Sequence, residues 1–320
     1  MIRIHALMAL LPLAIAPGGV AFQEDAEAPA DSEVRERRKA YEDVLERELP
    51  FAWSEHFLVL ADHDGFRFDK RKLGGKELAA EVATFAETVF ADYCEVLGLD
   101  PKKEFTKRSE ILLWEEQEDH EKVARDLLEW VAGEETEDWP IYRRGDRATY
   151  GLILDSAWAK DGAMLKRRLV HNIARGLLSC QKPSGLIGST GNGWLSVGLG
   201  MWFEDRAYGT IASVDQRDLL QELPSKPGKW RAAVKKLVKR DKIEDFEALV
   251  ASGEQQLDAD GSLVVASLID FLIAKDLPLF REFVLHMKNR SPTRDAVQVT
   301  YGWKMDEFEE AWSAWVEGTY

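Results

Sequence analysis

The sequence predicts an α+β protein, with a small N-terminal lobe of strands and helices followed by a mainly helical lobe. Short apolar runs typical of strands occur only in the first half, where they alternate with helical patterns. From residue 161 onward, apolar residues recur almost wholly at helical spacing. With 45% hydrophobic and 31% charged residues, the chain is expected to bury a substantial core.

The start of the chain has the pattern of an exported protein. Arg3 precedes an apolar run over residues 6–16, and small residues follow, which is typical of a secretory signal peptide over residues 1–23. The run is shorter than the roughly 20 residues that span a bilayer, and prolines interrupt it; an uncleaved anchor is the alternative. Residues 24–32, acidic and rich in alanine, are predicted to form a disordered tether. We therefore expect a secreted or periplasmic protein with no stable membrane span after cleavage.

The N-terminal α/β lobe is predicted over residues 33–160. Strand signals alternate there with helical ones, and the first helix is expected to end at Pro50. The strand signals are HFLVLAD (residues 56–62), EILLWE (110–115) and TYGLILDS (149–156), and the helical signals cover residues 33–49, 76–97 and 123–131.

The helical lobe is predicted over residues 161–320. A glycine-rich loop at residues 185–193 and a proline-bounded loop at residues 224–228 interrupt its helices. The last helices place Phe, Leu and Trp at helical spacing, and such stripes are usually core. The sequence predicts that this lobe packs around its own aromatic residues.

Charge and cysteine content exclude several classes of function. A formal net charge of -15 opposes non-specific binding to nucleic acid or to an anionic membrane surface, so no nucleic-acid partner is expected, although basic patches can persist locally. The two cysteines, Cys94 and Cys180, are too few for a disulfide scaffold or a cysteine-rich metal site. Both a disulfide between them and two unpaired thiols stay open.

Two segments of the helical lobe carry the most specific signal. They are RRLVHNIARGLL (residues 167–178) and GWLSVGLGMWFED (residues 193–205). The pair resembles the gluzincin zinc metallopeptidases, and especially the peptidase MA-like proteins, which have HExxH on one helix and a WLxEGLA-type segment on the next. The resemblance covers about residues 50–318 and implies that the helical lobe is gluzincin-like.

The resemblance also implies which residues stand at the positions of the zinc site. His171 matches the first histidine, Asn172 the catalytic glutamate, Arg175 the second histidine, and Val197 the glutamate that is the third ligand. Zinc needs ligands with a lone pair, and neither a valine nor a protonated arginine offers one. An asparagine amide cannot take a proton from a nucleophilic water. No catalytic residue, metal site or cofactor is therefore expected.

We predict a non-catalytic relative of these peptidases, a pseudo-peptidase that binds an unknown peptide, protein or cell-envelope component or acts as a structural module. Arg175 is predicted to replace the charge of the metal by pairing with Glu204 or another acid. The alternative is a working zinc hydrolase with displaced ligands, for which His171 and Glu204 are the candidates, or a metal-free enzyme. A scaffold that docks to a partner protein is a third hypothesis.

Other motifs are weak. The glycine loop lacks the GK[ST] ending of a phosphate-binding loop and does not follow a strand. DADG at residues 258–261 lacks the terminal glutamate of a calcium loop and is better interpreted as a turn and helix cap. His56, His63, His120 and His286 have no second ligand at metal spacing, so ordinary solvated or packed histidines are expected.

Overall fold

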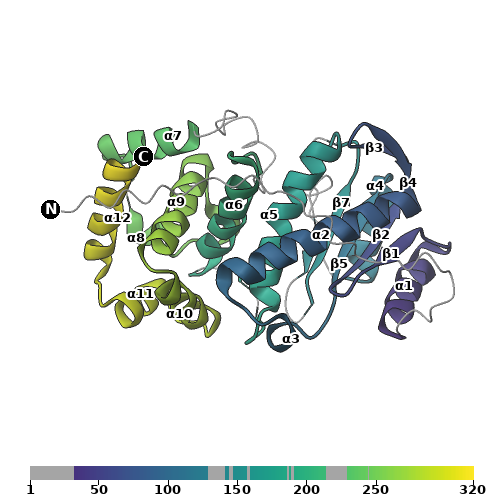
Figure 1. Cartoon of the computed structure of the whole chain (residues 1–320), viewed down its shortest axis with the longest axis horizontal. Coiled ribbons are helices and arrows are strands. Elements are labelled where there is room, and N and C mark those ends of the chain that lie inside the picture. Colours follow the sequence, from purple (N-terminus) through teal and green to yellow (C-terminus); the bar gives the residue numbers. More distant parts are fainter. Residues whose placement is uncertain are drawn as a thin grey trace.

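A computed structural model describes residues 32–128, 141–143, 147–156, 159–185, 187–188, 191–213, 229–243 and 245–320. It is an α+β structure, as predicted, with the strands in the N-terminal half and helices alone beyond residue 161 (Figure 1). The predicted signal peptide and residues 24–31 of the predicted tether lie outside the described residues. Among the helices in these ranges, none is long and apolar enough to cross a membrane.

The N-terminal half contains every strand among the described residues. Its elements are α1 (Ser32–Leu45), β1 (Phe51–Trp53), β2 (Phe57–Asp62), β3 (Asp64–Phe68), β4 (Arg71–Gly74), α2 (Gly75–Leu97), α3 (Pro101–Glu104), β5 (Ser109–Trp114), α4 (Gln117–Asp126), β6 (Ile141–Arg143) and β7 (Thr149–Ile153). The three predicted strands are β2, β5 and β7, and the predicted helix over residues 76–97 is α2. The hairpin β3–β4 and the three-residue strands β1 and β6 were not predicted.

The main sheet has the order β1-β2-β5-β7-β6, with the three central strands parallel and the outer two antiparallel. In the parallel register Leu58 lies opposite Glu110, and Glu110 lies opposite Thr149. Strands β2 and β5 are buried along almost their whole length. This explains their nearly continuous apolar sequences, because a central parallel strand is covered on both faces.

Each face of the sheet belongs to a different apolar core. Phe57, Val59 and Ala61 of β2 point into the larger core, which also contains residues of α2 and α5. Leu58 and Leu60 point the other way, into a smaller core closed by α1 and α4. The alternation follows the two-residue period of a strand. One face of the sheet therefore packs toward the helical half and the other toward α1.

The helical half is built around three long helices, α5, α6 and α9. Its elements are α5 (Gly162–Cys180), α6 (Gly193–Tyr208), α7 (Lys229–Lys239), α8 (Phe246–Leu249), the 3-10 turn η3 (Glu254–Gln256), α9 (Ala259–Lys275), α10 (Leu277–Lys288), α11 (Thr293–Tyr301) and α12 (Met305–Thr319). Helices α10 to α12 lie at the end of the molecule opposite to α1 (Figure 1).

Helix α6 packs closely between α5 and α9 because its glycines leave room for both. A Cβ atom at Gly198 would lie 2.6 Å from the carbonyl oxygen of Val265 on α9. A Cβ atom at Gly200 would lie 2.9 Å from the carbonyl oxygen of His171 on α5. Gly198 thus sets how close α6 comes to α9, and Gly200 sets how close it comes to α5.

The larger core is continuous from the sheet to the last helix. It includes Val59 of β2, Leu169 of α5, Leu268 of α9 and Val316 of α12. The predicted division at residues 160 and 161 coincides with the start of α5, which begins at Gly162. Because the two halves share this core, the division into two lobes stays a prediction.

Candidate functional site: a buried arginine cluster

The four motif positions lie inside the protein. Helix α5 starts at an N-cap, where the side chain of Asp161 accepts a hydrogen bond from the amide of Met164, and it is buried along most of its length. His171 and Arg175 are 0% exposed, Asn172 is 3% exposed and Val197 on α6 is 5% exposed. These side chains therefore lie in the packed interior of the protein and not on its surface.

The guanidinium of Arg175 is the centre of the site. Its Nη2 lies 2.8 Å from Oε2 of Glu254 in a salt bridge. Its Nε donates to Oγ of Ser196 on α6 at 3.2 Å, and its Nη1 lies 3.2 Å from Nε2 of His171 and 3.5 Å from Oδ1 of Asn172. We call these five residues the Arg175 cluster. The cluster joins α5, α6 and η3.

The predicted ion pair of Arg175 thus forms, and its partner is Glu254 rather than Glu204. Glu254 begins the 3-10 turn η3, where its amide donates to the carbonyl oxygen of Gly188 at 3.1 Å. A Cβ atom at Gly193, the first residue of α6, would lie 2.4 Å from that amide nitrogen. A glycine at the start of α6 is therefore what allows η3 to approach Arg175.

The same contacts fix the state of His171. An arginine side chain only donates hydrogen bonds, so Nε2 of His171 accepts the N–H of Arg175. The proton of the neutral imidazole then lies on Nδ1. The lone pair on Nε2 that a metal would need is already used.

Asn172 is oriented by the backbone of its own helix. Its Nδ2 donates to the carbonyl oxygen of Arg168 at 2.9 Å, which turns Oδ1 toward Arg175. The amide therefore acts as a hydrogen-bonding spacer between the helix and the guanidinium. It supplies no basic group to the site.

Glu204 serves a different part of the fold. Its carboxylate is 0% exposed and accepts hydrogen bonds from the amides of Ala212 at 2.9 Å and Ser213 at 3.0 Å, which fixes the turn that follows α6. Nη1 of Arg167 lies 3.6 Å away. Burial raises the pKa of Glu204 to about 7, against the opposing effect of the Ala212 amide and the charges of Arg168 and Arg167.

The residues at this site do not fit zinc. His171 is the one lone-pair donor among the three matched ligand positions, and Arg175 would bring a positive charge toward a dication. Glu204, the rescue candidate, uses its oxygens for the turn after α6. Across the described ranges, no group of three or more His, Cys, Asp or Glu side chains is arranged to hold a metal ion. We derive no reaction step through a metal.

Sequence reasoning missed two further buried polar clusters. Glu110 on β5 accepts hydrogen bonds from Tyr41 at 2.6 Å, from Thr149 at 2.9 Å, and from Arg37 and Arg147. Burial raises the pKa of this carboxyl, but the bonds from Arg37 and Tyr41 and the charge of Arg147 outweigh it and hold the pKa below its ordinary value. The cluster fastens α1 to the sheet.

The second missed cluster closes the C-terminal end of α5. Nζ of Lys288 on α10 donates to the carbonyl oxygens of Leu178 and, at 3.3 Å, Ser179. Burial lowers the pKa of Lys288 to about 8. Glu110 and Lys288 both stand in charged or amphipathic segments of the sequence, so no local pattern marks them as buried.

The remaining sequence candidates have structural roles. Asp258 caps α9, because its Oδ1 accepts from the amide of Gly261 at 2.7 Å, as predicted for a turn and helix cap. Nδ1 of His56 lies 2.8 Å from Oε2 of Glu87. Cys94 and Cys180 are both buried, and they form no disulfide in this structure.

The sequence matches no protein-family model, and no curated protein is significantly similar to it. Neither comparison bears on the resemblance to the gluzincins.

Proposed function

We propose that the chain is an exported, non-catalytic relative of the gluzincin peptidases, in which a buried arginine–glutamate pair takes the place of the metal. In this proposal the protein binds a peptide or a cell-envelope component, or serves as a structural module. The supporting observation is the pairing of Arg175 with Glu254 at the centre of the matched motif.

The electrostatics of the Arg175 cluster support this proposal. In a metallopeptidase a dication holds side chains from two helices together through their lone pairs. Here the guanidinium of Arg175 brings positive charge to the matched position and contacts Ser196 on α6 and Glu254 on η3. A charged hydrogen-bond donor thus performs the cross-linking role without a metal.

The chemistry of the cluster gives no route to hydrolysis. Activation of a water needs a base, and the group at the position of the catalytic glutamate is the amide of Asn172, held by Arg168 and Arg175. Nε2 of His171 accepts a hydrogen bond from the guanidinium of Arg175, so its lone pair is already engaged. His171, Asn172, Arg175 and Ser196 are buried and the side chain of Glu254 is 13% exposed, so little of the cluster is open to a substrate.

The test is the zinc content of the purified protein after incubation with excess zinc and desalting, measured by mass spectrometry. We expect almost no zinc per chain. About one zinc per chain, lost in His171→Ala, would overturn the proposal in favour of the alternative with His171 and Glu204 as displaced ligands, and peptidase assays would follow.

A restored motif tests the resemblance separately. The triple variant Asn172→Glu, Arg175→His and Val197→Glu places the family's residues on α5 and α6. If the two helices keep the peptidase arrangement, the folded variant should gain about one zinc per chain. Circular dichroism checks that it folds. A folded triple variant without zinc would contradict the resemblance to the gluzincins, but it would not affect the description of the Arg175 cluster in the native protein.

A further inference from the structure

Helix α7 carries a row of cations on an otherwise acidic protein. Its sequence is KWRAAVKKLVK, and Lys229, Lys236, Lys239 and the following Arg240 are exposed. At about 100° per residue, these four positions fall within an arc of roughly 100° of the helix surface. We call them the α7 cationic row. The chain as a whole has a formal charge of -15, so this concentration of one sign is local.

The opposite face of α7 is fully engaged by the protein. Trp230 and Val234 are buried in the larger core, and the indole of Trp230 donates to Asp205 at 2.8 Å. Arg231 binds Asp205 at 2.7 Å, and Lys235 donates to the carbonyl oxygens of residues 317 and 320. These contacts orient the helix, so the cationic row faces away from the body.

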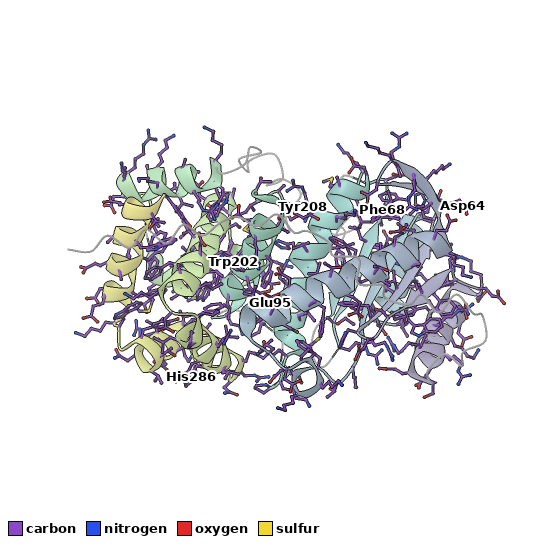
Figure 2. All side chains as sticks on the ribbon, in the orientation of Figure 1. Asp64, Phe68, Glu95, Trp202, Tyr208 and His286 are labelled. Carbon is purple, nitrogen blue, oxygen red and sulfur yellow. The ribbon has the colours of Figure 1, made fainter. Side chains whose placement is uncertain are left out.

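The side chains of the α7 cationic row have no acidic partner among the described residues. Within the described part of the chain, none of its four side chains forms an ion pair. Asp241 and Asp245 follow the C-terminal end of the helix, and after burial their charges are the next causes of the raised pKa of Glu309 on α12. Figure 2 shows side chains of α7 extending outward at the edge of the molecule. The positive charge is available to a partner.

We propose that the α7 cationic row docks the protein onto an anionic phospholipid surface. Lysine and arginine side chains near such a surface are attracted to its headgroups. A helix surface is convex, which suits a plane, whereas a linear polyanion is usually followed by a groove. Because the apolar face of α7 is packed inside the protein, the contact is electrostatic and at the level of the headgroups.

The acidic remainder of the protein makes this contact directional. Exposed charges farther apart than about 8 Å are largely screened at physiological ionic strength, so the row is attracted although the net charge is negative. Other faces would be repelled at close approach. This inference deepens the proposed function by naming the envelope component, but it does not depend on the state of the Arg175 cluster.

The experiment is co-sedimentation of the purified protein with phosphatidylglycerol vesicles and, in parallel, with phosphatidylcholine vesicles. We expect binding to phosphatidylglycerol alone, and loss of that binding at high salt. The variant Lys236→Gln, Lys239→Gln and Arg240→Gln should bind at least about tenfold more weakly. The matched control Lys72→Gln, Lys76→Gln and Lys102→Gln removes three exposed cations elsewhere and should bind within about twofold of the native protein.

Equal binding by the α7 variant and the native protein, or binding to both lipids, would overturn the inference. So would binding to soluble polyphosphate that depends on the α7 row without binding to vesicles, which would assign the row to a linear polyanion. The zinc measurement is made on the same preparation. If the protein holds no zinc and binds neither kind of vesicle, the lipid-docking inference is overturned but the proposed function is not.

Discussion

At the scale of single residues, the sequence indicates which residues at the positions matched to the gluzincin motif cannot bind zinc, but not which contacts they make instead. Asn172, Arg175 and Val197 are visibly unable to do zinc chemistry, and an acid partner for Arg175 follows from the cost of burying a lone charge. The identity of that partner does not follow. Glu254 is distant in sequence from Arg175 and stands in a short polar turn, so only the tertiary fold brings it to the cluster.

The first prediction concerns the Arg175–Glu254 pair. Arg175→Leu leaves the carboxylate of Glu254 without its guanidinium inside the protein, and the free energy of unfolding should fall by about 3 to 5 kcal/mol. Urea denaturation measures this. The double variant Arg175→Leu with Glu254→Leu should recover much of the loss, since it removes both charges.

The control for this prediction is Arg206→Leu. Arg206 binds Asp92 through two nitrogens, but its side chain is 42% exposed, so the loss should stay below about 1 kcal/mol. An unchanged urea midpoint in Arg175→Leu would contradict the view that the cluster holds the helices together.

The second prediction concerns Glu204, whose pKa rises on folding from an ordinary value of 4.5 to about 7. Between these values the folded state keeps a proton that the unfolded chain has lost. The free energy of unfolding therefore falls as the pH rises through this window, by up to about 3 kcal/mol. Glu204→Gln removes the titrating group, so this part of the slope should disappear.

Urea denaturation of the native protein and of Glu204→Gln at about pH 5 and about pH 8 checks this slope. Glu95→Gln is the control, because Glu95 is an exposed glutamate on α2 (Figure 2). If the free energy of unfolding depends on pH equally in the native and Glu204→Gln proteins, burial does not raise the pKa of the Glu204 carboxyl to near 7.

At the scale of elements, periodicity predicted the long helices and the buried strands, and it failed for short pairings. The hairpin β3–β4 turns at Asp69 and Lys70, which both have positive φ angles of 46° and 67°. A two-residue turn with positive φ angles usually has the sequence Asn-Gly or Asp-Gly, whereas the second residue here is a lysine. Packing of Phe66 and Phe68 into the larger core stabilises the turn in place of the usual residues.

The third prediction concerns the close packing of α6 on its neighbours. Gly198→Ala adds a methyl group 2.6 Å from the backbone of α9, which cannot give way as a flexible side chain does. The free energy of unfolding should fall by about 1 to 3 kcal/mol, although alanine favours a helix over glycine by about 1 kcal/mol. Urea denaturation measures the change.

Gly318→Ala on α12 is the matched control. A Cβ atom there meets nothing within 4 Å, so helix propensity alone acts and the variant should be equal to or more stable than the native protein. A Gly198→Ala protein as stable as Gly318→Ala would show that α6 and α9 can separate without cost.

At the scale of the whole molecule, the α+β class and the order of the two halves were predictable, because strand signals stop before residue 160. The continuity of the larger core was not. Leu169 and Val316 belong to the same core, but the sequence alone does not distinguish apolar residues that share one core from those that form separate cores. Likewise, the orientation of the α7 cationic row depends on the tertiary contacts of Arg231 and Lys235, since the sequence shows only an amphipathic basic helix.

The parallel pairing of β2, β5 and β7 has a consequence for how the chain reaches this structure. Parallel neighbours need long crossovers, and here α2 lies between β2 and β5 in the chain. A protein rich in such distant pairings folds more slowly than one built from neighbours in sequence. Until β5 pairs with β2, the apolar residues of β2 stay uncovered, so we expect slow formation of the sheet and a tendency of the unpaired chain to aggregate.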